Sequence, residues 1–114
     1  QRCAQHLASK TDILEAFGAG KEAVKQAVNG VTDKMVAFNR VYKDGKYTCQ
    51  YNLVDLSIVA NDEKKVPLDW LNDEQNNVNG KFIEYALPLI QGEMAAPIED
   101  GLPRFAKLNK ILAK

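Results

Sequence analysis

Hydrophobic residues recur at helical spacing near the start of the chain and predict its first helix. Ser9 or Thr11 is placed to cap this helix, because either hydroxyl can accept a hydrogen bond from a first-turn N–H group. Asn29-Gly30 marks its end, since glycine adopts the left-handed conformation after a helix at little cost. The side chains that we expect on its one apolar face are Ile13, Phe17, Val24, Ala27 and Val28.

Two glycines, Gly18 and Gly20, lie inside this predicted helix. Glycine in a helix interior is unfavourable by about 1 kcal/mol relative to alanine. We therefore interpret both as signs of close packing with a neighbouring element rather than of a break.

A β-hairpin is predicted next. Residues 35–42 are rich in strand-forming side chains, and residues 47–52 alternate between Tyr or Cys and smaller polar side chains. Asp44-Gly45 between them is the sequence expected of a two-residue type I′ turn. The flanking Lys43 and Lys46 are expected to lie in solvent at the tip.

Shorter elements are predicted in the middle of the chain. Residues 54–61 indicate a short helix with Asp55 near its cap, and residues 72–77 indicate a polar loop. Between them, Trp70 and Leu71 are predicted to be buried, with the tryptophan anchoring a core.

A second substantial helix is predicted over residues 81–91, with Asn79 as its cap. Pro88 lacks an N–H group and therefore predicts a kink or an early end, and Gly92 closes the element. The predicted inner stripe consists of Phe82, Ala86, Leu89 and Ile90.

The last residues carry an amphipathic pattern after an extended or irregular stretch over residues 93–103. Four cations without an acidic residue can favour an anionic membrane or a partner groove. We favour the simpler interpretation, a terminal helix or arm that docks on its own protein. The apolar side chains of this tail are Phe105, Leu108, Ile111 and Leu112, and the basic ones are Arg104, Lys107, Lys110 and Lys114.

The composition excludes several classes of protein. The 114 residues suit one domain, and 15 basic residues balance 15 acidic ones, so no net field attracts nucleic acid or a membrane. Cys3 and Cys49 form no disulfide framework, and we expect both to be reduced thiols in a cytoplasmic protein. The chain starts with Gln1, which fits either a processed exported protein or a piece of a longer one; the cysteine count favours the piece.

No self-contained catalytic centre is visible. The single histidine, His6, has no Cys or carboxylate partners at the spacing of a zinc site. The chain also has no glycine-rich phosphate loop between a strand and a helix, and no nucleophile elbow. We therefore predict neither catalytic residues nor metal ligands within this sequence.

Three basic residues precede or open the first helix: Arg2, His6 and Lys10. A guanidinium group presents a planar fork of donors that matches phosphate oxygens. Free backbone N–H groups over residues 9–12 would add partial positive charge. Two interpretations stay open at this point: the basic residues are simply solvated, or Arg2, supported by His6 or Lys10, holds a phosphorylated small molecule.

Five stretches, in order along nearly the whole chain, resemble pyrophosphate-dependent 6-phosphofructokinases: QRCAQHLASKTD, TDKMV, DLSIVANDEKKVPLDW, FIEYALPLIQGE and GLPRFAKL. The resemblance implies an α/β fold of two related domains with the active site between them. This chain would be a fragment of the C-terminal domain: helix, β-hairpin, short helix, helix and extended tail. Residues 1–92 would belong to the substrate domain and residues 93–114 would form a C-terminal arm.

The resemblance also implies a function. Such enzymes move a phosphoryl group reversibly between pyrophosphate and fructose 6-phosphate in glycolysis, with Mg²⁺. Gln1-Arg2 matches the end of the family's substrate motif, so Arg2 would bind the 6-phosphate of the sugar. Cys3-Ala4 stands where ATP-dependent relatives carry two glycines, which favours pyrophosphate as donor. The catalytic and Mg²⁺-binding residues would lie outside this chain, and the fragment alone would be inactive.

The expected partners are fructose 6-phosphate, pyrophosphate, the remainder of the enzyme and a second copy in a homo-oligomer. One alternative is a stand-alone interaction module that docks a partner through its basic tail. Another, compatible with the enzyme, is a structural C-terminal segment that shapes an oligomer interface. The length of the native gene product distinguishes the module from the fragment.

Overall fold

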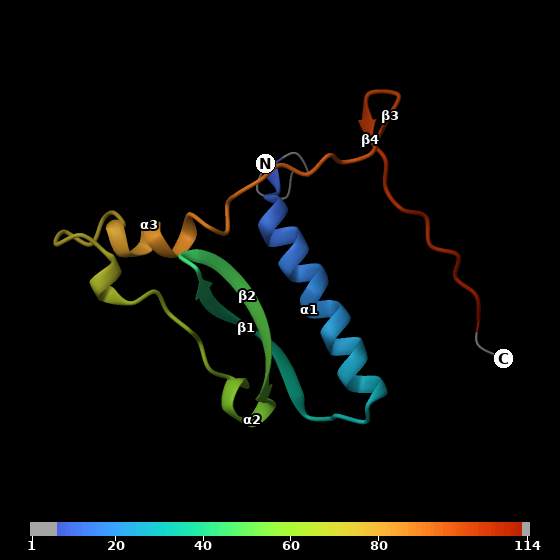
Figure 1. The fold of residues 1–114 in the computed structure, drawn as a ribbon, viewed down its shortest axis with the longest axis horizontal. Coiled ribbons are helices and arrows are strands. Elements are labelled where there is room, and N and C mark those ends of the chain that lie inside the picture. The colour runs from blue at the N-terminus through green and yellow to red at the C-terminus, as the bar shows by residue number, and fades with distance from the viewer. Residues whose placement is uncertain (1–6, 113–114) are drawn as a thin grey trace.

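The computed structural model describes residues 7–112 and shows a small α/β unit (Figure 1). A long helix lies beside a two-stranded hairpin, and short helical segments and an extended tail follow. This order agrees with the predicted one. The elements are α1 Lys10–Val28, β1 Lys34–Lys43, β2 Lys46–Asp55, α2 Leu56–Val59, η2 Leu68–Trp70, α3 Gly80–Ala86, β3 Ile98–Glu99 and β4 Leu102–Pro103.

Helix α1 begins and ends where its capping residues predict. Of the two candidate caps, Ser9 is the one used: its hydroxyl accepts a hydrogen bond from the N–H group of Asp12 at 3.2 Å. At the other end Gly30 has φ +80°, the left-handed conformation that glycine adopts after a helix. Both boundaries were therefore set by local sequence.

The hairpin of β1 and β2 has the predicted turn. Lys43 pairs with Lys46, so the loop contains only Asp44 and Gly45. Both have positive φ, 51° and 73°, as a type I′ turn requires. The two lysines are exposed at the tip, as expected.

Helix α2 is shorter than predicted. Residues 54 and 55 belong to β2 rather than to a helix, because Asp55 pairs with Lys34 across the hairpin and the two side chains form an ion pair. Only Leu56–Val59 is helical, and Asp55 precedes it without a side-chain capping bond. The cross-strand partner, which local sequence does not reveal, decides where the strand ends.

Helix α3 is capped as predicted but ends early. The side chain of Asn79 accepts a hydrogen bond from the N–H group of Lys81 at 3.0 Å. The helix ends at Ala86, two residues before Pro88, so the predicted extent to residue 91 is wrong and the predicted early end is confirmed. Ile90, placed on the inner stripe from the sequence, is 66% exposed.

Aromatic side chains join η2 to α3. The ring centroid of Trp70 lies 5.0 Å from that of Tyr85 and 6.2 Å from that of Phe82. Trp70 and Leu71 are half-buried rather than fully buried. Trp70 therefore packs against the two aromatic rings of α3, but its predicted burial in a core is not seen in the described chain.

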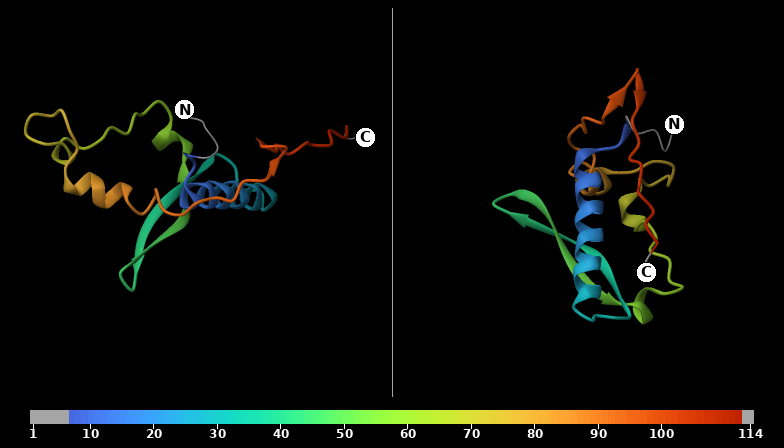
Figure 2. Two further views of the ribbon diagram at one scale, coloured as in Figure 1. Left: turned by 90° about the horizontal axis from the view of Figure 1, so that it is seen from above. Right: turned by 90° about the vertical axis from the view of Figure 1, so that its right-hand side faces the viewer.

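The described residues have no closed hydrophobic core: none of their side chains is fully buried. The apolar face predicted for α1 is present but does not pack on the hairpin: Phe17 is 73% exposed and Val28 is 81% exposed. Helix α1 crosses the hairpin (Figure 2) and contacts it through the face that carries Glu15 and Gly18.

The C-terminal tail forms no helix. After the small β3–β4 hairpin, residues 104–112 have no regular secondary structure. Of the two forms predicted for the tail, a helix or an arm, the helix is absent over this range and the extended form is present. The tail is exposed and does not dock on the rest of the described chain; the division into units at residue 92 stays a prediction. No helix among residues 7–112 has the length and apolar character needed to cross a membrane.

Candidate functional site at the start of helix α1

The start of α1 is held by a distant segment of the chain. The hydroxyl of Ser9 donates to the carbonyl oxygen of Leu89 at 2.5 Å, and the hydroxyl of Thr11 donates to that of Gln91 at 3.1 Å. The backbone also pairs, because the N–H group of Lys10 donates to the carbonyl of Gly92 at 2.9 Å. The residues immediately after α3 therefore fix the helix start.

These bonds overturn one expectation from the sequence. The N–H groups over residues 9–12 were predicted to be free to bind an anion. Those of Lys10 and Thr11 instead donate to carbonyls of residues 92 and 91, and that of Asp12 donates to the Ser9 hydroxyl. The returning segment satisfies these groups, so the helix start offers little to a ligand.

The predicted basic residues are only partly described. Arg2 and His6, and Cys3 of the cysteine pair, lie outside residues 7–112. Lys10 is exposed at the first position of α1. The supporting role of Lys10 for an anion therefore stays a prediction.

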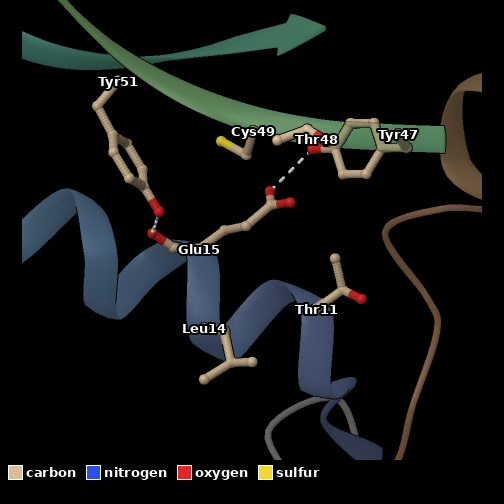
Figure 3. A pocket seen from close by; sticks show the side chains of 7 residues that line it. All are labelled: Thr11, Leu14, Glu15, Tyr47, Thr48, Cys49 and Tyr51. Atoms are coloured by element: carbon tan, nitrogen blue, oxygen red, sulfur yellow. Dashed lines mark hydrogen bonds between the residues drawn. The ribbon is translucent and has the colours of Figure 1, made fainter. Parts of the chain in front are cut away.

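A hollow of about 340 Å³ lies between α1 and β2 (Figure 3). Glu15 reaches from α1 toward the strand, where its carboxylate accepts a hydrogen bond from the hydroxyl of Tyr47 at 3.0 Å. The hydroxyl of Tyr51 donates to the backbone carbonyl of Glu15 at 3.1 Å. The hollow is lined by Thr11, Leu14, Glu15, Tyr47, Thr48, Cys49 and Tyr51.

The ionisable side chains in this hollow are poorly suited to catalysis, because the pKa values of Tyr47 and Cys49 are both raised. Two main causes raise the pKa of Tyr47 well above its usual range. Partial burial is the larger one, and the hydrogen bond to Glu15 is the next. Partial burial and the same carboxylate also raise the pKa of Cys49, which keeps the thiol protonated and weakly nucleophilic at neutral pH. We interpret the hollow as the joint between helix and hairpin. Nowhere in residues 7–112 do three His, Cys, Asp or Glu side chains gather as ligands for a metal ion.

Gly18 makes this joint possible. A Cβ atom at Gly18 would lie only 2.0 Å from the hydroxyl oxygen of Tyr51. At Gly20, nothing lies within 4 Å of the same position. The close packing predicted from the two glycines is therefore confirmed at Gly18 and is absent at Gly20 within the described chain.

Sequence reasoning missed the role of Arg40. Its guanidinium carbon lies 4.7 Å from the ring centroid of Tyr47 and 4.4 Å from that of Tyr85. The same group donates to the backbone carbonyl of Tyr85 at 2.6 Å. Arg40 thus joins the hairpin to α3. Because these contacts occupy its guanidinium group, we do not expect Arg40 to bind a phosphate. The sequence offered no clear signal for these contacts, because residues 35–42 alternate poorly and the two tyrosines come from other elements.

The chain has clear relatives. It is 42% identical over 110 residues to pyrophosphate–fructose 6-phosphate 1-phosphotransferase of Halomonas elongata, a match that covers 96% of this chain and 26% of the relative. The protein of the same name from Methylococcus capsulatus is 36% identical over 111 residues, a match that covers 97% of this chain and 26% of that relative. No protein-family model matches the chain.

A solved structure agrees with these relatives. The crystal structure of a pyrophosphate-dependent phosphofructokinase from Marinobacter aquaeolei matches 99% of this chain and 29% of its own, with a TM-score of 0.87 and 38% identity. The chain is similar to one part of a pyrophosphate-dependent phosphofructokinase. It spans about a quarter of the length of the curated relatives it matches.

These findings confirm the resemblance to pyrophosphate-dependent phosphofructokinases that the sequence motifs predicted. They also confirm the α/β fold as a fragment of a phosphofructokinase structure. The α1–hairpin joint and the polar contacts that fix the start of α1 are therefore features of that fragment.

Proposed function

We propose that this chain is part of a phosphotransferase that moves phosphate reversibly between pyrophosphate and fructose 6-phosphate. The observation that carries the proposal is the match of 96% of the chain, at 42% identity, to an enzyme named for that reaction. The activity requires the rest of the polypeptide. Mg²⁺ and the residues that transfer the phosphoryl group belong to that rest, and the isolated 114-residue chain is inactive.

The contribution of this chain is Arg2, which binds the 6-phosphate of the sugar. Phosphoryl transfer depends on positioning and charge neutralisation, and a bidentate guanidinium on the remote phosphate fixes the sugar for in-line reaction of its 1-hydroxyl group. The bonds from Ser9 and Thr11 to residues 89 and 91 support this role, because they fix the helix that follows Arg2. His6 and Lys10 add positive charge near the same end of the helix.

The cellular setting follows from the reaction. An enzyme that interconverts phosphorylated sugars acts in glycolysis, and we place it in the cytoplasm as a homo-oligomer. Neither nucleic acid nor a membrane is a partner, since the chain has balanced charge.

The test uses the complete protein, assayed for phosphorylation of fructose 6-phosphate by pyrophosphate with Mg²⁺. Replacing Arg2 by Ala removes one charge-assisted contact of about 2–3 kcal/mol, so we expect kcat/KM for the sugar to fall roughly 30- to 150-fold. Arg2→Lys, which keeps charge but loses the fork, is expected to recover part of the loss.

Lys43→Ala at the exposed hairpin tip serves as the control and is expected to leave kcat/KM unchanged. A complete protein without pyrophosphate-dependent activity contradicts the proposed reaction. Full activity of Arg2→Ala contradicts the role of that residue alone.

A further inference from the structure

Helix α1 turns its polar face toward the hairpin and its apolar face away from it. Contact with β2 is made by Glu15, through Tyr47 and Tyr51, and by Gly18, against Tyr51. Nine residues at about 100° each place Val24 about 180° around the helix from Glu15. The side of α1 opposite the hairpin therefore carries its hydrophobic side chains, which is the reverse of an ordinary amphipathic helix on the surface of a domain.

We define the outer stripe as Phe17, Val24, Ala27 and Val28. Phe17 is 73% exposed, Val24 66% and Val28 81%, and Ala27 is also exposed. Gly20 lies beside these residues with nothing within 4 Å of the position of its missing side chain. Lys21, four residues after Phe17 and three before Val24, lies on the same side of α1 and is exposed. Its aliphatic stem can cover apolar surface while its ammonium group reaches past the contact. The apolar side chains around it favour an occupant that is mainly apolar.

We infer that the outer stripe of α1 is the surface on which the rest of the same polypeptide packs. The chain covers 26% of the Halomonas elongata relative and 29% of the Marinobacter aquaeolei structure, so most of each of those proteins lies outside the matched part. The fragment keeps the conformation of that structure, with a TM-score of 0.87, and yet none of the side chains in residues 7–112 is fully buried. Contiguous apolar surface of this kind marks an interaction site.

The occupant is an apolar face of that remaining polypeptide rather than a second copy of the chain. A hydrophobic helix face pointing away from its hairpin becomes the inner side of a layer when further elements of the same fold cover it. Helix α1 would then be a middle layer, with the hairpin on one side and the rest of the enzyme on the other. This inference rests on the proposed function only in taking the chain as part of a longer protein.

The test measures the reactivity of introduced thiols in the complete protein. Cys3 and Cys49 are first replaced by Ser, and a single cysteine is then placed in the outer stripe as Val24→Cys. Lys43→Cys at the exposed hairpin tip is the matched control. Each rate of reaction with a maleimide is divided by the rate of the same variant in denaturant, which removes the intrinsic difference between sites.

We expect Val24→Cys to react at least 10-fold more slowly than Lys43→Cys after this correction, at every protein concentration. Equal corrected rates overturn the inference. Protection of Val24→Cys that disappears on dilution, together with a smaller particle by light scattering, assigns the stripe to a second copy and also overturns it.

The same samples separate this inference from the proposed function. Protection of Val24→Cys in a protein without phosphotransferase activity supports the packing surface and contradicts only the reaction. Activity together with an unprotected Val24→Cys contradicts only the packing surface.

Discussion

Helix α1 and the C-terminal tail carry similar patterns of apolar and charged residues, and only one of them is a helix. Helix α1 has 19 residues, a side-chain cap at Ser9 and a glycine after its end. Residues 104–112 follow Pro103 directly, have no such cap and remain without regular structure. Because an isolated helix of about ten residues is marginal in water, an amphipathic pattern needs caps and a packing partner to become a helix.

The two regions also differ in how they are attached. Helix α1 is fixed at its start by Leu89–Gly92 and at its middle by Tyr47 and Tyr51. The tail bonds back mainly at its first residue, where the N–H group of Arg104 donates to the carbonyl of Pro97 at 2.9 Å. The stability of this unit should therefore depend on the joints of α1 far more than on the tail.

The largest effect is expected at Gly18. A Cβ atom there would lie 2.0 Å from the hydroxyl oxygen of Tyr51 and 2.6 Å from its ring carbon Cζ. Gly18→Ala should lower the free energy of unfolding of the complete protein by about 1–3 kcal/mol, which is the usual cost of overpacking. Denaturant titration gives this value from the midpoint and slope.

Gly20→Ala is the matched control. Nothing in the described chain lies within 4 Å of its missing Cβ atom. The change leaves the contact with Tyr51 intact and adds one methyl group beside the outer stripe, so it should lower the free energy of unfolding less than Gly18→Ala does. Adding Tyr51→Phe to Gly18→Ala removes the clashing oxygen and should recover part of the loss. Equal stability of the two alanine variants would show that α1 does not pack on β2 at Gly18.

A smaller loss is expected for Ser9→Ala. The hydroxyl of Ser9 caps α1 and donates to the carbonyl of Leu89, so both contacts disappear together. The free energy of unfolding should fall by about 1–2 kcal/mol, measured by the same titration. Ser57→Ala, at an exposed serine of α2, should change it by less than about 0.5 kcal/mol. If Ser9→Ala were as stable as Ser57→Ala, the contacts of the Ser9 hydroxyl would not stabilise the start of α1.

The contact of Tyr47 with Glu15 predicts a dependence on pH. Tyr47→Phe loses one hydrogen bond, which is worth about 0.5–1.5 kcal/mol at neutral pH. Because folding raises the pKa of Tyr47, the folded state holds this proton more tightly than the unfolded state does. Its contribution is complete below the unfolded pKa of about 10 and is lost as pH rises through the folded pKa.

Unfolding should therefore be followed between neutral and strongly alkaline pH. The stability of Tyr47→Phe should fall less steeply above about pH 10 than that of the parent protein. Glu15→Gln should give an intermediate slope, because it removes the charge but keeps an acceptor. Identical slopes for the parent protein and Tyr47→Phe would contradict the assigned cause of the shift.

The smallest effect is expected in the tail. Deletion of residues 104–114 removes side chains that make few contacts with the described chain; Leu108 and Leu112, for example, are 82% and 90% exposed. The free energy of unfolding should change by less than about 0.5 kcal/mol. If the deletion lowered the free energy of unfolding as much as Gly18→Ala does, the tail would have to pack against another surface. The tail would then contribute to stability as α1 does.

Prediction from sequence succeeded wherever the deciding groups are neighbours along the chain. Ser9 and Gly30 marked the ends of α1, and Asp44-Gly45 formed the predicted turn. Pro88 marked the early end of α3. Each signal acts through a bond or a dihedral angle within a few residues, so no distant partner is needed to interpret it.

Prediction failed where the contacts of a residue are made with residues far along the chain. The N–H groups at the start of α1 looked available for an anion, but carbonyls about 80 residues later satisfy them. The helical pattern around Val24 correctly predicted a helix with one apolar face and did not indicate which side faces the hairpin. Arg40 gave no sign of its contacts with Tyr47 and Tyr85, because these come from two other elements.

The sequence by itself determined both ends of α1, the turn of the hairpin and the resemblance to pyrophosphate-dependent phosphofructokinases. Tertiary structure alone decided that α1 meets the hairpin through Glu15 and Gly18 and leaves Phe17 and Val28 exposed. The physical reason is the distance along the chain over which the deciding contacts act. Caps and turns are satisfied by adjacent residues, whereas the buried side of a helix is chosen by whichever surfaces the whole fold brings against it.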